Sequence, residues 1–155
     1  HAELPVVDAS RAELERGDFR PFRELAPDVP FAMTAHVVYT ALDPERPATL
    51  SPRVIGEVIR GAIGFRGILL SDDLAMQALT GTPAERATAA LAAGCDLALF
   101  CPGRLEDNAA VLAAVPPVTD RVASLLAELA TRYPAPEPLV AEAATARLAA
   151  LLEIA

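Results

Sequence analysis

Lysine is absent from this sequence of 155 residues. Arginine supplies all 13 basic side chains against 21 acidic ones, and the formal net charge is −8. Proteins that bind nucleic acid need clustered cations to contact phosphate groups, and so do proteins that bind anionic membrane surfaces. The arginines form no basic stripe, so we expect neither nucleic acid nor a membrane among the partners.

Long apolar runs are also missing, and we expect no leader peptide. The apolar runs are far shorter than the roughly 20 residues that a membrane span requires, and no charged-then-apolar leader stands at the front. Cysteine is scarce, because Cys95 and Cys101 are the only two. Along an extended strand they would lie about 20 Å apart, too far for a disulfide. We therefore expect reduced thiols, no zinc site and a cytoplasmic location.

Three short apolar runs, each followed by a helical pattern, indicate the fold class. They cover residues 31–38, 67–71 and 96–101. Runs of this length are typical of strands buried on both faces, and their spacing of roughly 30–35 residues matches one βα unit each. We predict an α/β fold with a parallel sheet. Two architectures fit this pattern: a small doubly wound domain, or the end of a (β/α)8 barrel, which typically takes about 250 residues.

The predicted helices are marked by their end residues. Ser51 followed by Pro52 predicts a helix that ends at Gly64. The segment 82–85 (TPAE) forms a capping box, and Gly94 ends the helix that it begins. The remaining sequence predicts a long loop over 39–50, a linker over 133–138, and helices over 10–17, 105–114, 118–132 and 139–153.

The segment 67–76 (GILLSDDLAM) is the most informative, because a buried strand there ends in two adjacent carboxylates, Asp72 and Asp73. In βα folds the carboxyl ends of the strands face the active site. Adjacent side chains on an extended segment point in opposite directions, so we expect only one carboxylate to enter a site. The alternative is that one of them merely caps the next helix.

Four other residues are candidates for a functional or a structural role. His36 stands late in the first predicted strand, where it would be a ligand, an acid, a binder, or a hydrogen-bonded histidine of the core. His1 is the first residue of the sequence, and a terminal position alone indicates no function. Met76 is expected to pack, and Arg60 is expected to be a solvated charge.

A family resemblance rests on four stretches: HAELPVVD (1–8), PFAMTAHVVYTALDPERPATLSP (30–52), VIRGAIGFRGILLSDDLAMQAL (58–79) and ERATAALAAGCDLALFC (85–101). They resemble family 3 glycoside hydrolases, specifically the peptidoglycan-recycling β-N-acetylglucosaminidases of the NagZ type. The family's active-site signature contains two aliphatics and a basic residue, then glycine, three aliphatics, Ser or Thr, and the nucleophilic Asp. Here Arg60, Gly67, Ser71 and Asp72 fall in step, whereas Ala62 departs where a polar residue is usual.

The resemblance implies an architecture and two catalytic residues. Asp72, not Asp73, would be the nucleophile at the end of the seventh strand of a (β/α)8 TIM barrel. The three predicted strands would be strands six to eight, with residues 1–115 as the C-terminal portion of the barrel and 116–155 as extra C-terminal helices. His1 matches the final histidine of a mobile loop in the family and would be the acid/base. Its partner aspartate would precede it, so the chain would be an incomplete part of the enzyme, inactive alone.

The implied reaction is the retaining hydrolysis of a terminal β-linked N-acetylglucosamine from a muropeptide or anhydro-muropeptide. Asp72 would form a glycosyl-enzyme, while His1 would protonate the leaving oxygen and then activate water. No metal or organic cofactor is implied, and His36 and Met76 would line the substrate site at most. Two other interpretations stay open: a receiver-like α/β domain that binds Mg²⁺ through Asp72 and Asp73, or another family 3 enzyme such as a β-glucosidase.

Overall fold

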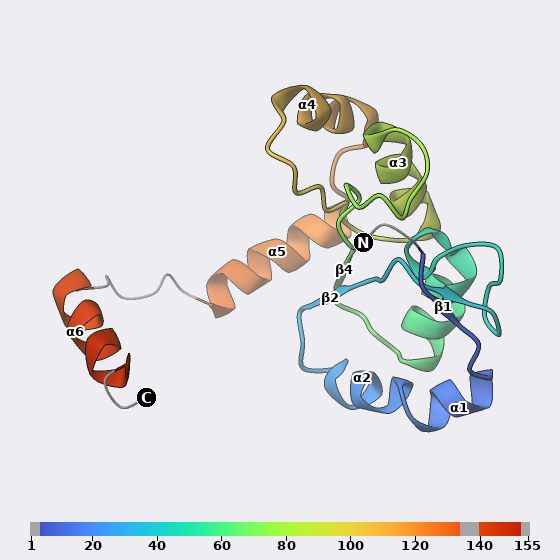
Figure 1. Ribbon diagram of the computed structural model, residues 1–155, viewed down its shortest axis with the longest axis horizontal. Coiled ribbons are helices and arrows are strands. Elements are labelled where there is room, and N and C mark those ends of the chain that lie inside the picture. Colours follow the sequence, from blue (N-terminus) through green and yellow to red (C-terminus); the bar gives the residue numbers. More distant parts are fainter. Residues whose placement is uncertain (1–3, 134–139, 153–155) are drawn as a thin grey trace.

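A computed structural model describes residues 4–133 and 140–152 of the chain (Figure 1). Strand β2 (Phe31–Met33) pairs in parallel with β4 (Ile68–Leu70), with Phe31 opposite Ile68. An isolated parallel bridge joins Leu70 to Leu97. These parallel pairs, separated by helices, confirm the predicted α/β fold.

The single strand predicted over 31–38 is wrong, because the structure divides it into two strands with different partners. β2 ends at Met33, and β3 (Val38–Tyr39) pairs in parallel with β1 (Val6–Val7), which the sequence did not predict. Between them, the carbonyls of Ala35 and Val37 accept hydrogen bonds from the amides of Thr49 and Ala48 (3.2 and 2.8 Å). Those donors belong to the 3₁₀ helix η1 (Ala48–Leu50), which therefore replaces a neighbouring strand here.

The strand predicted over 96–101 is also shorter than expected. Leu97 forms the only ladder bridge that the described part of this segment makes. Two residues later the Leu99 amide donates to the Ser71 hydroxyl (2.8 Å) instead of to a strand carbonyl. A side chain thus ends the ladder at this point.

Five α-helices follow their predicted boundaries closely: α1 (Arg11–Arg16), α3 (Pro83–Ala93), α4 (Leu105–Ala114), α5 (Asp120–Arg132) and α6 (Ala141–Leu152). A further helix, α2 (Phe19–Leu25), was not predicted. The capping box of α3 is confirmed, because Thr82 and Glu85 each accept a backbone N–H from the other. Gly94, at φ 116°, ends that helix in the left-handed conformation that glycine favours.

The helix predicted after Ser51 is present, but its turns are wider than an α-helix. Its central part, η2 (Val54–Ala62), is a π-helix, and the Ile63 amide donates to the Val58 carbonyl five residues earlier (2.8 Å). The Ser51 hydroxyl accepts from the Val54 amide (3.0 Å), as its predicted capping role requires. The sequence therefore predicts this helix and its first residue correctly, but not its hydrogen-bond pattern.

Two groups of buried side chains hold these elements together. The first packs η2, β4 and α3 through Ile55, Phe65, Leu69, Leu74, Leu79 and the alanines of α3. The second packs α1 and α2 on the other part of η2 through Leu14, Phe19, Leu42, Val54 and Val58. α4 packs on α3, whereas α6 buries none of its described residues and lies apart in Figure 1. No helix in the described ranges is long and apolar enough to cross a membrane.

Candidate active site

The carboxyl ends of the parallel segments meet at one edge, where Asp72 lies. The Thr34 amide, just after β2, donates to the Leu70 carbonyl (2.9 Å). Ser71, fully buried just after β4, donates its amide to the Leu97 carbonyl (3.0 Å). Asp72 therefore follows β4 and is the first residue beyond this ladder.

The two adjacent carboxylates have different surroundings. Asp73 uses Oδ1 to accept the amides of Ala75 (3.0 Å) and Cys101 (3.1 Å), so it fixes a turn and joins two segments. Asp72, which is half-buried, accepts only the Asp73 amide (2.8 Å) on Oδ1. Among the described residues its Oδ2 has no hydrogen-bond partner, and no arginine pairs with it. Asp73 thus has the structural role, and Asp72 keeps a carboxylate oxygen available for chemistry.

Both carboxylates give this edge a negative character. Cys101 is exposed, but partial desolvation of its thiol, the neighbouring charges of Asp73 and Asp72 and a hydrogen bond to Asp73 raise the pKa of the thiol. Within residues 4–133 and 140–152, no three His, Cys, Asp or Glu side chains are grouped as a metal site requires. Cys95 and Cys101 are both free thiols.

His36 is almost completely buried, at 3% exposure, between β2 and β3. Its Nδ1 lies 2.9 Å from the Thr49 hydroxyl and its Nε2 lies 2.9 Å from the Asp73 carbonyl oxygen. Both ring nitrogens therefore have partners within the chain. The predicted role of His36 in lining a substrate site stays a prediction, and the structure adds that its contact with the site runs through backbone and threonine atoms.

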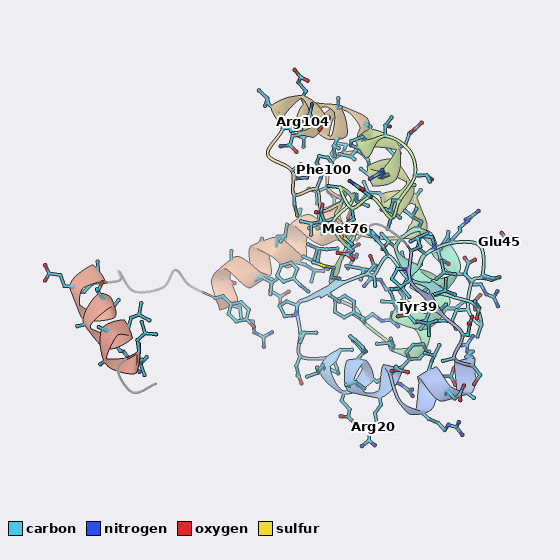
Figure 2. The ribbon with its side chains drawn as sticks, in the orientation of Figure 1. Arg20, Tyr39, Glu45, Met76, Phe100 and Arg104 are labelled. Atoms are coloured by element: carbon cyan, nitrogen blue, oxygen red, sulfur yellow. The ribbon has the colours of Figure 1, made fainter. Side chains whose placement is uncertain are left out.

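The segment after Asp73 is shaped by an arginine that the sequence pattern did not single out. Arg86 donates to the carbonyls of Leu74, Met76 and Gly81 (2.9, 3.0 and 3.0 Å) and so holds the loop that leads to α3. Met76, labelled in Figure 2, lies half-exposed in this loop. A lone arginine near a helix start carries no distinctive sequence signal, so only the fold reveals its role.

Asp72 lines neither of two cavities found in the described part of the chain. One, of about 480 Å³, lies between η1 and α3. The other, of about 370 Å³, lies between α2, β2 and η2. The second predicted catalytic residue, His1, lies outside the described residues, so its distance from Asp72 is not part of the structure.

The opposite, amino end of β4 contains an ion-pair network. Asp96, with 13% side-chain exposure, accepts from Arg60 (2.7 Å), from Arg121 and from the Leu69 amide (2.8 Å). Arg60 also donates to the carbonyl of Gly67 (2.9 Å), so the expectation that Arg60 is a solvated charge was wrong. Burial raises the pKa of the Asp96 carboxyl, but the hydrogen bonds from Arg121 and Leu69 and the charges of both arginines outweigh burial and lower it.

The signature glycine also has a structural reason at this end of the strand. A Cβ atom at Gly67 would lie 2.4 Å from the Pro30 carbonyl oxygen and 2.7 Å from the Phe65 ring. Side chains do not tolerate such distances, so only glycine allows β2, β4 and the end of η2 to approach this closely.

The sequence of the chain matches a known protein family. Residues 1–130 match the model of the glycosyl hydrolase family 3 N-terminal domain. The match covers most of the chain, so the chain belongs to glycosyl hydrolase family 3.

Two curated relatives of the chain are β-hexosaminidases. A β-hexosaminidase from Alkalilimnicola ehrlichii is 48% identical over 126 residues, which cover 77% of this chain and 36% of that protein. A β-hexosaminidase from Tolumonas auensis is 45% identical over 130 residues, 81% of this chain and 39% of that protein. The chain thus spans little more than a third of the length of these relatives.

Solved structures agree with this assignment. A family 3 β-N-acetylglucosaminidase from Paenibacillus sp. superimposes with a TM-score of 0.75 at 35% identity, over 91% of this chain and 30% of that one. NagZ from Neisseria gonorrhoeae in complex with N-trifluoroacetyl-D-glucosamine gives 0.71 at 33% identity, over 82% of this chain and 36% of that one.

Proposed function

We propose that this chain supplies the nucleophile-bearing part of a retaining β-hexosaminidase that removes terminal β-linked N-acetylglucosamine. Membership of glycosyl hydrolase family 3 and the names of the relatives support this activity. The similarity to a NagZ structure that holds an N-acylated glucosamine derivative supports the sugar class.

The observation that carries the proposal is the difference between Asp72 and Asp73. Asp72 follows the signature serine at the carboxyl end of β4, where βα enzymes place their catalytic groups. Its Oδ2 is not used by any described residue, whereas Asp73 is bound to two backbone amides. Asp72 would attack the anomeric carbon and form a covalent glycosyl-enzyme, and the leaving oxygen would be protonated by His1, which later activates water.

The proposed barrel follows from the same correspondence. We assign β2, β4 and the segment around Leu97 to strands six to eight of a (β/α)8 barrel, residues 1–115 to the barrel and 116–155 to additional helices. The chain spans little more than a third of the length of its relatives, which supports this assignment. The rest of the sugar pocket would then come from parts of the enzyme outside this chain.

A narrower substrate class and a cellular location are proposed because the signature segments have a NagZ-type sequence. The substrate would be a GlcNAc-containing muropeptide or anhydro-muropeptide released during cell-wall recycling, and the enzyme would act in the cytoplasm. The two free cysteines fit a reducing compartment.

The magnesium-binding alternative has less support. A receiver-like site would need both carboxylates to face one cation. Instead, the Asp73 oxygen that would be shared is bound to the amides of Ala75 and Cys101.

The decisive kinetic test compares substitutions of two neighbouring residues, made in the whole protein that the gene encodes. We expect Asp72→Asn to lower kcat for p-nitrophenyl β-N-acetylglucosaminide by about 10³-fold or more, as loss of a covalent nucleophile does. Asp73→Asn is the matched control, because the Asn oxygen can still accept both backbone amides, and its kcat should fall by less than about 10-fold. Near-normal turnover in Asp72→Asn would refute the assignment.

A further inference from the structure

Three buried polar side chains behind the nucleophile take no direct part in the reaction described above. Thr34, Thr49 and His36 are 6%, 0% and 3% exposed, and they come from the end of β2, from η1 and from the segment between β2 and β3. Burying polar groups costs free energy unless each is hydrogen-bonded, so their partners are informative.

The hydrogen bonds among these residues have one consistent direction. The Asp72 amide donates to Thr34 Oγ1 (3.1 Å), and the Thr34 hydroxyl donates to Thr49 Oγ1 (2.9 Å). His36 Nε2 faces a carbonyl oxygen, which can only accept, so the ring of a neutral His36 carries its proton on Nε2, and Nδ1 accepts from the Thr49 hydroxyl (2.9 Å). His36 Nε2–H then donates to the Asp73 carbonyl (2.9 Å). A neutral His36 with its proton on Nε2 satisfies every group in this network.

The network begins and ends on the backbone of the two residues at the strand end. It takes the amide of Asp72 at one end and the carbonyl of Asp73 at the other, so it holds the peptide groups that precede and follow this pair of residues. Asp72 lies just beyond the β4 ladder, and its amide has the Thr34 hydroxyl as its partner in place of a strand carbonyl. The orientation of Asp72 is therefore set by side chains rather than by the sheet.

We propose that Thr34, Thr49 and His36 form a positioning network that fixes the Asp72 carboxylate for attack on the sugar. The inference rests on the proposed function, because positioning has meaning only if Asp72 is the nucleophile. None of the three residues touches the substrate in this role, and they act through the backbone of Asp72 and Asp73. Displacing a nucleophile by about 1 Å can cost on the order of 100-fold in rate, so such a network affects kcat.

Thr49 is the best residue to change, because it is in the middle of the network. Thr49→Val keeps the shape and removes the hydroxyl, so the Thr34 proton and His36 Nδ1 both lose their partner. Thr49→Ser keeps the hydroxyl and loses one methyl group. Thr88→Val is a matched control, since the Thr88 hydroxyl binds only carbonyls of its own helix, α3 (3.0 Å).

We expect Thr49→Val to lower kcat by about 10- to 100-fold while KM changes by less than about 3-fold. Thr49→Ser should keep at least about half of the parental kcat, and Thr88→Val should match the parent. Active sites are counted by covalent trapping with a slow fluorinated N-acetylglucosaminyl fluoride, so unfolded molecules do not enter the rate. Equal kcat per active site in Thr49→Val and Thr49→Ser would overturn the proposal.

A second measurement separates failure of this proposal from failure of the proposed function. Nitrogen NMR of the parent should show His36 protonated on Nε2, and Thr49→Val should shift the Asp72 amide resonance. A histidine protonated on Nδ1, or an unmoved Asp72 amide, overturns the network whether or not the enzyme is active. A parent protein that hydrolyses no β-GlcNAc glycoside overturns the proposed function, and the catalytic role of the network with it.

Discussion

The carboxylates at the two ends of β4 differ in how many partners they bind. At the amino end, Asp96 accepts from two arginines and a backbone amide. At the carboxyl end, Asp72 accepts one backbone amide and pairs with no arginine of the described residues. In βα folds the amino ends of the strands serve stability and the carboxyl ends serve chemistry, and the proposed role of Asp72 fits that division.

The comparison also explains two parts of the family signature. The signature arginine, Arg60, binds Asp96 and the Gly67 carbonyl, at the end of the strand opposite to Asp72. The signature glycine, Gly67, allows β2 to approach β4. Only the final Asp72 of the motif belongs to the proposed chemistry, and the residues before it shape the strand that presents it.

The largest effect on stability should come from the amino end. Asp96→Asn leaves Arg60 without its carboxylate in a site where the pair is only 21% and 13% exposed, so we expect about 2–4 kcal/mol of destabilisation in urea unfolding. Asp107→Asn is the control, because its pair with Arg104 is on the surface (75% and 36% exposed) and should contribute less than about 1 kcal/mol. Equal losses in both variants would remove the distinction between a buried and a surface pair.

Gly67→Ala should be next in size, since its Cβ would meet a backbone carbonyl that cannot move freely. We expect about 1–3 kcal/mol of destabilisation by overpacking. Gly56→Ala is the matched control, because a Cβ at Gly56 in η2 meets nothing within 4 Å, and alanine there should be neutral or stabilising by up to about 1 kcal/mol. Thermal unfolding of both variants measures the contrast, and a Gly67→Ala protein as stable as Gly56→Ala would contradict the close approach.

The pH dependence of stability should follow Asp96. Its pKa is lower in the folded protein than the ordinary value of about 3.9, so its charge stabilises the folded state above that pH. This stabilisation is lost as the pH falls through the folded-state pKa. The free energy of unfolding should therefore decrease below about pH 4, and less steeply in Asp96→Asn. Identical slopes for parent and variant in urea titrations would show that Asp96 is not responsible.

The smallest effect on stability is expected for Asp72→Asn. Its carboxylate makes one local hydrogen bond and no ion pair among the described residues, so unfolding free energy should change by less than about 0.5 kcal/mol. Differential scanning calorimetry of Asp72→Asn then tests whether Asp72, unlike Asp96, contributes little to stability. A large loss of stability would assign Asp72 a structural role like that of Asp96.

Local signals in the sequence predicted the helices well. The capping box at Thr82–Glu85, the cap at Ser51 and the helix over 105–114 each depend on residues a few positions apart, and each is present. The division of 31–38 into β2 and β3 was not predictable in this way. It results from η1, more than ten residues later, whose amides bind the carbonyls of Ala35 and Val37.

The candidate site was predictable only in part. The strand-end position of the two carboxylates followed from an apolar run ending in Asp-Asp, but the choice of Asp72 came from the family signature. The structure adds that Asp73 is bound to two amides. Partners such as Thr49 with His36, or Arg60 with Asp96, are brought together only by the fold, so no local pattern indicates them.

Covalent trapping tests the central claim most directly. The gene-encoded protein is incubated with a 5-fluoro-N-acetylglucosaminyl fluoride, which slows hydrolysis of the glycosyl-enzyme, then digested and analysed by mass spectrometry. We predict one sugar attached to the peptide that contains GILLSDDLAM, with fragmentation assigning it to Asp72. A sugar on Asp73 or on another peptide, or inactivation without any adduct, would contradict the account.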